Sequence, residues 1–251
     1  MRLRLLGIAC FSCLSMVLAG SGPPPRTVEY PEARLRALEV DEGARPLVLL
    51  HGYGSAPQQW LPFVGTIRRS PAIRLIFPEG PDVGADGRGR GWWPLDLASH
   101  RDSTGLPDLS RTRPPGLAAA AARVETLLGE ITTRLGSRPG DLLLGGFSQG
   151  GMVSAEIAFR SDTPLKALIL LSPTVVDEPS WRDGIPLRRG LPVFVAHGRE
   201  DEVLPFSATA RLAETLRTAG LSVTWVPFDG GHEIPVPVVT ALNEFLANID
   251  R

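Results

Sequence analysis

The sequence predicts an α/β fold built on a doubly wound, mostly parallel sheet with helices on both faces. Several short runs of consecutive apolar residues suit strands that are buried on both faces. Stretches with helical length and spacing separate these runs, which is the alternation expected of a parallel sheet with right-handed crossovers. A chain of 251 residues with 43% hydrophobic and 21% charged residues can bury a full core in one domain.

The individual elements follow from these patterns in chain order. Residues 27–40 indicate one or two opening antiparallel strands. Buried strands are predicted at residues 47–50, 73–77, 141–145, 165–171, 191–196 and 222–228. Helices are predicted at residues 58–69, 117–135, 152–160, 207–218 and 236–247.

The first 21 residues have the outline of a secretory signal peptide. Arg2 and Arg4 form a basic start, residues 5–19 are an apolar stretch, and small residues follow before a proline run. Cleavage after Ala19 fits the small-residue rule, so the sequence predicts a secreted or periplasmic protein whose residues 22–251 form a single α/β domain. The formal net charge of −1, without a basic run, argues against a nucleic-acid partner.

Two alternatives would leave the N-terminus on a membrane. An uncleaved anchor is disfavoured because the 15 apolar residues are short of the roughly 20 that a span needs. Lipidation of Cys10 or Cys13 is disfavoured because neither follows a Leu-small-small run. If the segment is removed, the mature chain has no cysteine, which excludes a disulfide or a thiol nucleophile. No integral membrane span is expected after signal removal.

Residues 83–115 form an irregular, lid-like segment rich in glycine, arginine and proline. A loop of this length inside a compact domain is typically functional or disordered. Trp92 and Trp93 stand among its polar residues, and two interpretations remain open: they plug an edge of the core, or they wall a substrate pocket.

The pentapeptide Gly146-Phe147-Ser148-Gln149-Gly150 stands between a predicted strand and a predicted helix. A G-x-S-x-G at such a junction forces the serine into a tight, strained turn that flanking glycines permit. The turn exposes the serine hydroxyl and directs the first helix amides toward the atom that it attacks. Ser148 is therefore the candidate nucleophile.

Candidate partners for Ser148 follow later strands of the predicted sheet. Asp201 follows the strand at residues 191–196, and His232 follows the strand at residues 222–228. A serine needs a base within hydrogen-bond reach, and the imidazole needs a carboxylate to orient it. Ser148, Asp201 and His232 also occur in the Ser, acid, His order of α/β-hydrolases.

Other acids and histidines have plainer interpretations. Glu200 and Glu202 read as solvated charges, and Asp177 is a reserve candidate for the acid. His51 and His197 precede glycines at strand ends and are predicted to bond loop backbone, whereas His100 lies in the irregular segment.

Two backbone amides are candidates for an oxyanion hole. The amide of Gln149 directly follows the nucleophile, and that of Tyr53 lies in the Gly-rich loop after residues 47–50. Gly52 and Gly54 allow that loop to turn its amide inward.

Four motifs together resemble the phospholipase/carboxylesterase family of α/β-hydrolases, which includes acyl-protein thioesterases. They are Leu50-His51-Gly52-Tyr53-Gly54, Gly146-Phe147-Ser148-Gln149-Gly150-Gly151, His197-Gly198-x-x-Asp201-x-x-x-Pro205 and Gly231-His232-Glu233. The resemblance, from about Leu47 to the C-terminus, implies ester or thioester hydrolysis through an acyl-enzyme on a small-molecule ester, with no metal or organic cofactor. The signal peptide and residues 83–115 depart from the family pattern.

The sequence therefore predicts an exported serine carboxylesterase. A polymer-ester or feruloyl-type esterase, similar to polyhydroxyalkanoate depolymerases, is an alternative motivated by the export signal and the two tryptophans. A non-catalytic binding protein with a hydrolase fold is a further alternative from a different class.

Overall fold

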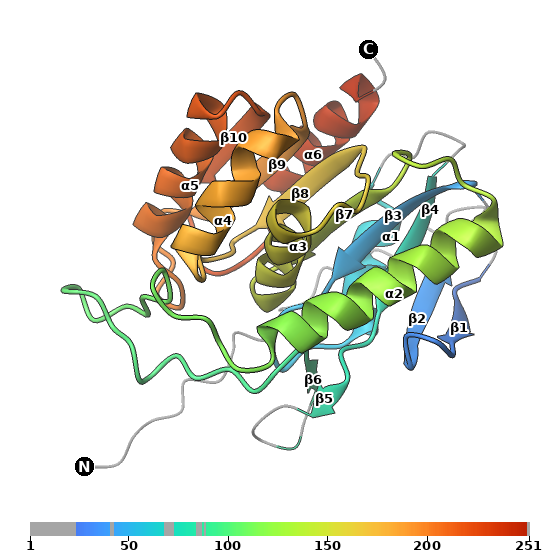
Figure 1. The fold of residues 1–251 in the computed structure, drawn as a ribbon, viewed down its shortest axis with the longest axis horizontal. Coiled ribbons are helices and arrows are strands. Elements are labelled where there is room, and N and C mark those ends of the chain that lie inside the picture. Colours follow the sequence, from blue (N-terminus) through green and yellow to red (C-terminus); the bar gives the residue numbers. More distant parts are fainter. Residues whose placement is uncertain (1–23, 41–42, 68–72, 84–86, 88, 250–251) are drawn as a thin grey trace.

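The computed structural model describes residues 24–40, 43–67, 73–83, 87 and 89–249 (Figure 1). The predicted signal peptide lies outside the described residues. An eight-stranded sheet runs through the molecule, and a separate two-stranded ribbon lies beside it. The strands of the large sheet are β1 (Arg26–Tyr30), β2 (Leu35–Val40), β3 (Arg45–Leu50), β4 (Ile73–Pro78), β7 (Leu143–Phe147), β8 (Ala167–Leu171), β9 (Pro192–Gly198) and β10 (Ser222–Phe228). The ribbon pairs β5 (Asp82–Val83) with β6 (Arg90–Gly91).

The sheet has the spatial order β1-β2-β4-β3-β7-β8-β9-β10. β2 pairs antiparallel with both β1 and β4, and all other pairings are parallel. This is the predicted doubly wound, mostly parallel sheet of an α/β-hydrolase. The carboxyl ends of β3, β7, β9 and β10 therefore lie at one edge, where ligands bind in open parallel sheets.

Helices cover both faces of the sheet. They are η1 (Pro57–Trp60), α1 (Leu61–Val64), α2 (Leu117–Leu135), α3 (Gln149–Arg160), α4 (Glu178–Gly184), η2 (Ile185–Arg188), α5 (Phe206–Thr218) and α6 (Val236–Asn248). In Figure 1, α2 and α3 lie in front of the sheet, and buried residues of α2, α3, α4 and α5 share one core cluster. Buried residues of η1 and α6 belong to a second cluster on the opposite face.

Strand β3 shows why continuous apolar runs predicted buried strands. Val48 and Leu50 belong to the core cluster that includes α2, whereas Leu47 and Leu49 belong to the cluster that includes α6. Successive side chains of a strand point to opposite faces, and helices cover both faces here. All four residues are therefore fully buried. A strand covered on both faces needs apolar residues at every position.

The predicted helix at residues 58–69 is present only in part among the described residues. The chain forms a 3₁₀ turn and then a single α-turn that ends at Gly65. Pro62, near the start of α1, has no N–H to donate, so it cannot continue a helical ladder from the preceding turn. Trp60 stacks on Phe77 with ring centroids 5.9 Å apart, which places the segment against β4.

Most other elements are within a few residues of their predicted positions. The strand predicted at residues 141–145 begins two residues later, because β7 continues through Gly146 and Phe147 in register with Leu170 and Leu171 of β8. Helix α4 and the turn η2 were not predicted. Within the described ranges, no helix is long and apolar enough to cross a membrane.

Candidate active site

Ser148 occupies the tight turn between β7 and α3, with φ 53° and ψ −119°. A non-glycine residue rarely adopts a positive φ, so the turn is strained. An added Cβ at Gly146 would lie 2.4 Å from the carbonyl carbon of Gly150, and one at Gly150 would lie 2.2 Å from the carbonyl oxygen of Leu50. The Ser148 amide donates to the Leu171 carbonyl at 2.8 Å, which attaches the turn to β8. The two glycines are therefore packing requirements of this turn.

His232 lies in the loop after β10, beside the turn that holds Ser148. Its ring packs against the ring of Phe147, with centroids 4.7 Å apart, and Phe147 directly precedes Ser148. The loop crosses closely over the end of β9, because a Cβ added at Gly198 would lie 2.3 Å from the Gly230 carbonyl oxygen. These two contacts bring the imidazole to the nucleophile turn from a distant part of the sequence.

Asp201 follows β9, and its side chain is completely buried. Its Oδ2 accepts a hydrogen bond from His232 Nδ1 at 2.7 Å, and its Oδ1 accepts from the amides of Val203 and Leu204, each at 2.8 Å. Burial alone would raise the pKa of Asp201, but hydrogen bonds from His197 and His232 hold that pKa well below its usual range. Because the ionised carboxylate only accepts, Nδ1 of His232 carries a hydrogen and Nε2 is free to take up a proton.

A second histidine contacts the same carboxylate. Nε2 of His197 lies 3.0 Å from Asp201 Oδ2 and 3.2 Å from the Leu204 carbonyl oxygen. The predicted bond to loop backbone is present, but the contact with Asp201 was not predicted. The four-residue spacing between His197 and Asp201, across the end of a strand, was the signal available in the sequence.

The predicted oxyanion loop after β3 lies against the nucleophile turn. A Cβ added at Gly52 would lie 3.3 Å from the Cβ of Ser148. Gly54 has φ 72°, in the left-handed region that favours glycine. Tyr53, between these glycines, is thus brought near Gln149, which is the first residue of α3 and directly follows Ser148. Amides at a helix N-terminus favour negative charge.

Trp92 and Trp93 lie in the core and do not wall an open pocket. They are only 2% and 1% exposed, and they belong to the cluster that packs against α2 and α3. The Gln149 side chain holds both: its Oε1 accepts from the Trp92 amide at 2.9 Å, and its Nε2 donates to the Trp93 carbonyl at 2.8 Å. The Trp92 indole N–H donates to the His51 carbonyl at 2.8 Å. The two tryptophans therefore pack in the core and connect the nucleophile turn, through Gln149, to the oxyanion loop, through His51. We call this set of contacts the brace.

His51 is a neutral support for this loop. Its Nε2 accepts a hydrogen bond from the Gly80 amide at 2.9 Å, so Nδ1 carries the hydrogen and donates to the Gly52 carbonyl at 2.7 Å. Burial lowers the pKa of His51 to about 4, which keeps the ring uncharged at neutral pH. This confirms the predicted bond to loop backbone.

The other candidate acids are placed elsewhere. Asp177 is the residue before α4, and its Oδ2 accepts from Arg113 at 2.7 Å. Burial alone would raise the pKa of Asp177, but hydrogen bonds from Arg113 and Ser180 lower it. Glu200 and Glu202 are exposed, as solvated charges should be. Of the acids considered, the structure pairs Asp201 with His232.

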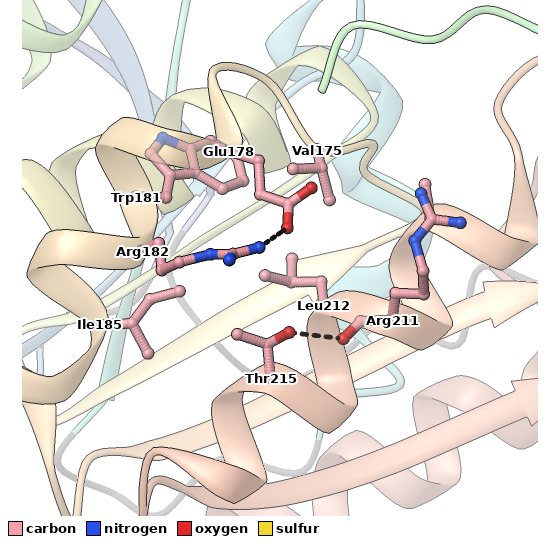
Figure 2. Close-up of a pocket in the computed structure, with 9 residues that line it drawn as sticks. Val175, Glu178, Trp181, Arg182, Ile185, Arg211, Leu212 and Thr215 are labelled. Carbon is pink, nitrogen blue, oxygen red and sulfur yellow. Dashed lines mark hydrogen bonds and ion pairs between the residues drawn. The ribbon is translucent and has the colours of Figure 1, made fainter. Parts of the chain in front are cut away.

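A cavity of about 20 Å³ lies between α4 and α5, in a different place from these residues (Figure 2). Its wall includes Trp181, Leu212 and the ion pair of Glu178 with Arg182, whose atoms are 2.7 Å apart. A shallower groove of about 550 Å³ shares part of this wall. None of the predicted site residues lines either space.

The fold and the serine turn define the class of the protein as an α/β-hydrolase. The model of the phospholipase/carboxylesterase family matches residues 39–249, and the chain belongs to this family. It is therefore an ester or thioester hydrolase in class. Among the residues that the structure describes, no group of three His, Cys, Asp or Glu side chains could hold a metal ion.

Named relatives and solved structures agree with this family. The chain is 25% identical over 202 residues to acyl-protein thioesterase 1 of Gibberella zeae, covering 76% of this chain and 84% of the relative. It is 29% identical over 217 residues to the protein of that name from Aspergillus fumigatus, covering 81% and 87%. The crystal structure of esterase PE8 superposes with a TM-score of 0.74 and 29% identity, covering 86% of this chain and 99% of that one. A carboxylesterase of Mesorhizobium loti shares the fold, with a TM-score of 0.68, 19% identity and coverage of 88% and 99%.

Proposed function

We propose that this protein is a serine carboxylesterase that cleaves ester or thioester bonds of small molecules through an acyl-enzyme. The observation that carries the proposal is the 2.7 Å bond between His232 Nδ1 and Asp201 Oδ2 beside the strained turn of Ser148. A buried, ionised carboxylate orients the imidazole and stabilises the cation that it becomes. No residue of this arrangement needs a metal or an organic cofactor for its role.

The proposed reaction has two halves. Ser148 Oγ attacks the carbonyl carbon while its proton passes to His232 Nε2, and the oxyanion is stabilised by the amides of Tyr53 and Gln149. The intermediate collapses, the bond to the leaving group breaks, and the alcohol or thiol takes the proton from His232. Water then attacks the acyl-enzyme with His232 as base, which releases the acid and restores Ser148.

Replacing the nucleophile tests the proposal directly. Ser148→Ala should abolish hydrolysis of p-nitrophenyl esters and labelling by a fluorophosphonate probe, because both reactions need the Oγ atom. Ser154→Ala is a matched control, since Ser154 is buried in α3 and donates to the Gly150 carbonyl at 2.9 Å. Activity that survives in purified Ser148→Ala protein would refute the assignment.

A panel of substrates tests which bond, ester or thioester, and which acyl group the protein prefers. The name of the thioesterase relatives motivates a thioester arm beside short-chain acyl esters and aryl esters. Polyhydroxyalkanoate and feruloyl esters test the alternative of a polymer-ester or feruloyl-type esterase. The burial of Trp92 and Trp93 removes one of the two reasons for that alternative, and the export signal remains.

We also propose that the protein is secreted or periplasmic. The basic start, the apolar stretch and the small residues before the proline run support cleavage after Ala19. N-terminal sequencing of protein from the native host's medium or periplasm should give a chain that begins at Gly20. A full-length chain that stays with the membrane fraction would indicate an anchor.

A further inference from the structure

The carboxylate of Asp201 has more hydrogen-bond partners than orienting one imidazole requires. Its Oδ1 accepts two backbone amides, and its Oδ2 is shared by two imidazoles, His232 Nδ1 at 2.7 Å and His197 Nε2 at 3.0 Å. The side chains of Asp201 and His197 are both completely buried. The carboxylate is therefore shielded from solvent.

The proton on His197 can be assigned from its neighbours. Nε2 faces two acceptors, Asp201 Oδ2 and the Leu204 carbonyl oxygen at 3.2 Å, so it carries the hydrogen. Nδ1 is buried and has no hydrogen-bond partner among the described residues. The ring lies edge-on to Phe206, with centroids 6.0 Å apart, which fixes its plane. His197 is therefore held as a single donor directed at the carboxylate.

We propose that His197 is a positioning residue that holds Asp201 and tunes how strongly its Oδ2 stabilises the His232 cation. The proposal rests on the serine hydrolase function above. A second donor on Oδ2 disperses the negative charge of that oxygen, which makes the oxygen a weaker partner for His232. The same bond stops rotation of the carboxylate away from His232, so that the imidazole keeps its orientation.

The remaining charged groups around Asp201 do not compete with this role. On its own loop these are Arg199, Glu200 and Glu202, and on the loop after β10 they are Asp229 and Glu233. All five are exposed, so solvent screens their fields. The first turn of α5, which follows the Asp201 loop, begins with the uncharged residues Phe206 and Ser207.

Three substitutions at His197 separate positioning from packing. The side-chain amide nitrogen of Gln is as many bonds from the backbone as Nε2 of His, so His197→Gln can keep a hydrogen-bond donor to Asp201. His197→Asn is too short to bring its amide to Oδ2, and His197→Leu removes the donor while keeping apolar volume. Loss of the outer hydrogen-bond partner of a reacting group costs about 10- to 100-fold in metal sites, which sets the scale expected here.

We expect His197→Leu and His197→Asn to lower kcat by about tenfold with KM nearly unchanged, because substrate binding is not affected. The acid limb of the pH profile of kcat/KM should move to higher pH by about 0.5 unit or more, since Oδ2 then stabilises the His232 cation more strongly. His197→Gln should retain most of the kcat and the wild-type limb. Thermal unfolding of each variant reports its stability separately.

Val193→Ala is the control for lost stability alone, because Val193 is completely buried on the same strand, β9. If His197→Leu does not fold, the comparison of His197→Gln with His197→Asn still tests whether a donor to Asp201 is needed. The proposal is overturned if His197→Asn or His197→Leu keeps the wild-type kcat and the wild-type acid limb of the pH profile. It is also overturned if His197→Gln and His197→Asn lose kcat equally. The proposed hydrolase function is tested separately. It holds if the wild-type protein hydrolyses the ester and Ser148→Ala does not, even when the His197 proposal fails.

Discussion

The side chains of Glu39 in β2 and Asp201 after β9 are both completely buried, and their partners differ in kind. Glu39 is surrounded by arginines, which stay charged at any pH at which the protein folds. Asp201 is bonded by two imidazoles and two backbone amides. The difference separates a carboxylate that maintains structure from one that can stabilise a cation formed by proton transfer to His232.

The Glu39 network joins distant elements of the fold. Its Oε2 lies 3.1 Å from Arg74 of β4 and 3.4 Å from Arg26 of β1, and its Oε1 accepts from Arg134 of α2 and from the Tyr30 hydroxyl. Burial raises the pKa of Tyr30, and the bond to Glu39 raises it further. The permanent cations already balance the charge of Glu39, so that it has no counter-charge to offer elsewhere.

Asp201 is bonded by imidazoles and backbone amides, none of which carries a permanent charge. Its lowered pKa keeps it ionised, and the positive charge that balances it forms on His232 only when Ser148 loses its proton. Neutral donors can stabilise a buried carboxylate without using up its charge. The comparison therefore predicts that loss of Asp201 affects the rate, whereas loss of Glu39 affects stability.

The largest expected effect is that of Asp201→Asn on the rate. The amide removes the negative charge and can reverse the tautomer of His232, which costs about 10⁴-fold in kcat in comparable triads. Steady-state hydrolysis of a p-nitrophenyl ester measures it, with Glu202→Gln as the exposed neighbouring control. A kcat within tenfold of the wild type would remove Asp201 from the mechanism.

Glu39→Gln should have the next largest effect, and it should act on stability. Breaking a buried ion pair leaves uncompensated charge, which costs about 3–5 kcal/mol in the free energy of unfolding. Urea denaturation measures this, and kcat per active site, titrated with a fluorophosphonate, should stay near the wild-type value. The control is Glu178→Gln, whose more exposed pair with Arg182 contributes only about 0.3–0.5 kcal/mol. A fall in kcat with unchanged stability would contradict the comparison.

Gln149→Leu is an intermediate case that should change both properties. It keeps the backbone amide but leaves the Trp92 amide and the Trp93 carbonyl without their partner, at about 1–3 kcal/mol. Since Trp92 also bonds the carbonyl of His51, the oxyanion loop should shift and kcat should fall by about tenfold. This is less than the roughly 10²- to 10³-fold loss that follows complete removal of an oxyanion donor, because the backbone amide of residue 149 remains. Urea denaturation and kcat are measured together, with Ser154→Ala as control. A stability loss without any rate loss would show that the brace does not reach the loop.

The smallest effect near neutral pH concerns the acid dependence of stability. The folded pKa of Asp201 lies below its unfolded value of about 3.9, so its contribution is fully present above that value and is lost as pH falls through the folded pKa. The difference in unfolding free energy between wild type and Asp201→Asn should therefore narrow as pH falls below about 4. A difference that grows in acid would reverse the assigned direction of the pKa shift.

Local patterns in the sequence predicted the features that depend on neighbouring residues. The apolar runs predicted strands such as β3, and the glycines around Ser148 predicted its turn, because a missing Cβ acts on adjacent backbone. The bounds of strand β7 and the length of the helix predicted at residues 58–69 were less well predicted. Pairing with β8 sets where β7 begins and ends. Pro62 and Gly65 limit the helix to a short turn.

The roles of single side chains were harder to predict when they depended on distant contacts. Trp92 and Trp93 could serve a pocket or a core equally well in sequence, and only the Gln149 side chain, more than 50 residues away, shows that they brace the core. The contact of His197 with Asp201 was missed for a related reason. A histidine before a glycine at a strand end has many possible backbone partners, and packing selects among them.

The sequence by itself determined the sheet of alternating strands and helices, the serine turn, and the Ser148, Asp201, His232 order, because each depends on local periodicity or spacing. The tertiary structure supplied the bond itself between His232 and Asp201, the acid preferred from the sequence, since that bond requires the loops after β9 and β10 to cross at Gly198. It also decided which buried carboxylate is bonded by arginines and which by imidazoles. Such partners come from separate strands, and their distance is set only when the sheet is assembled.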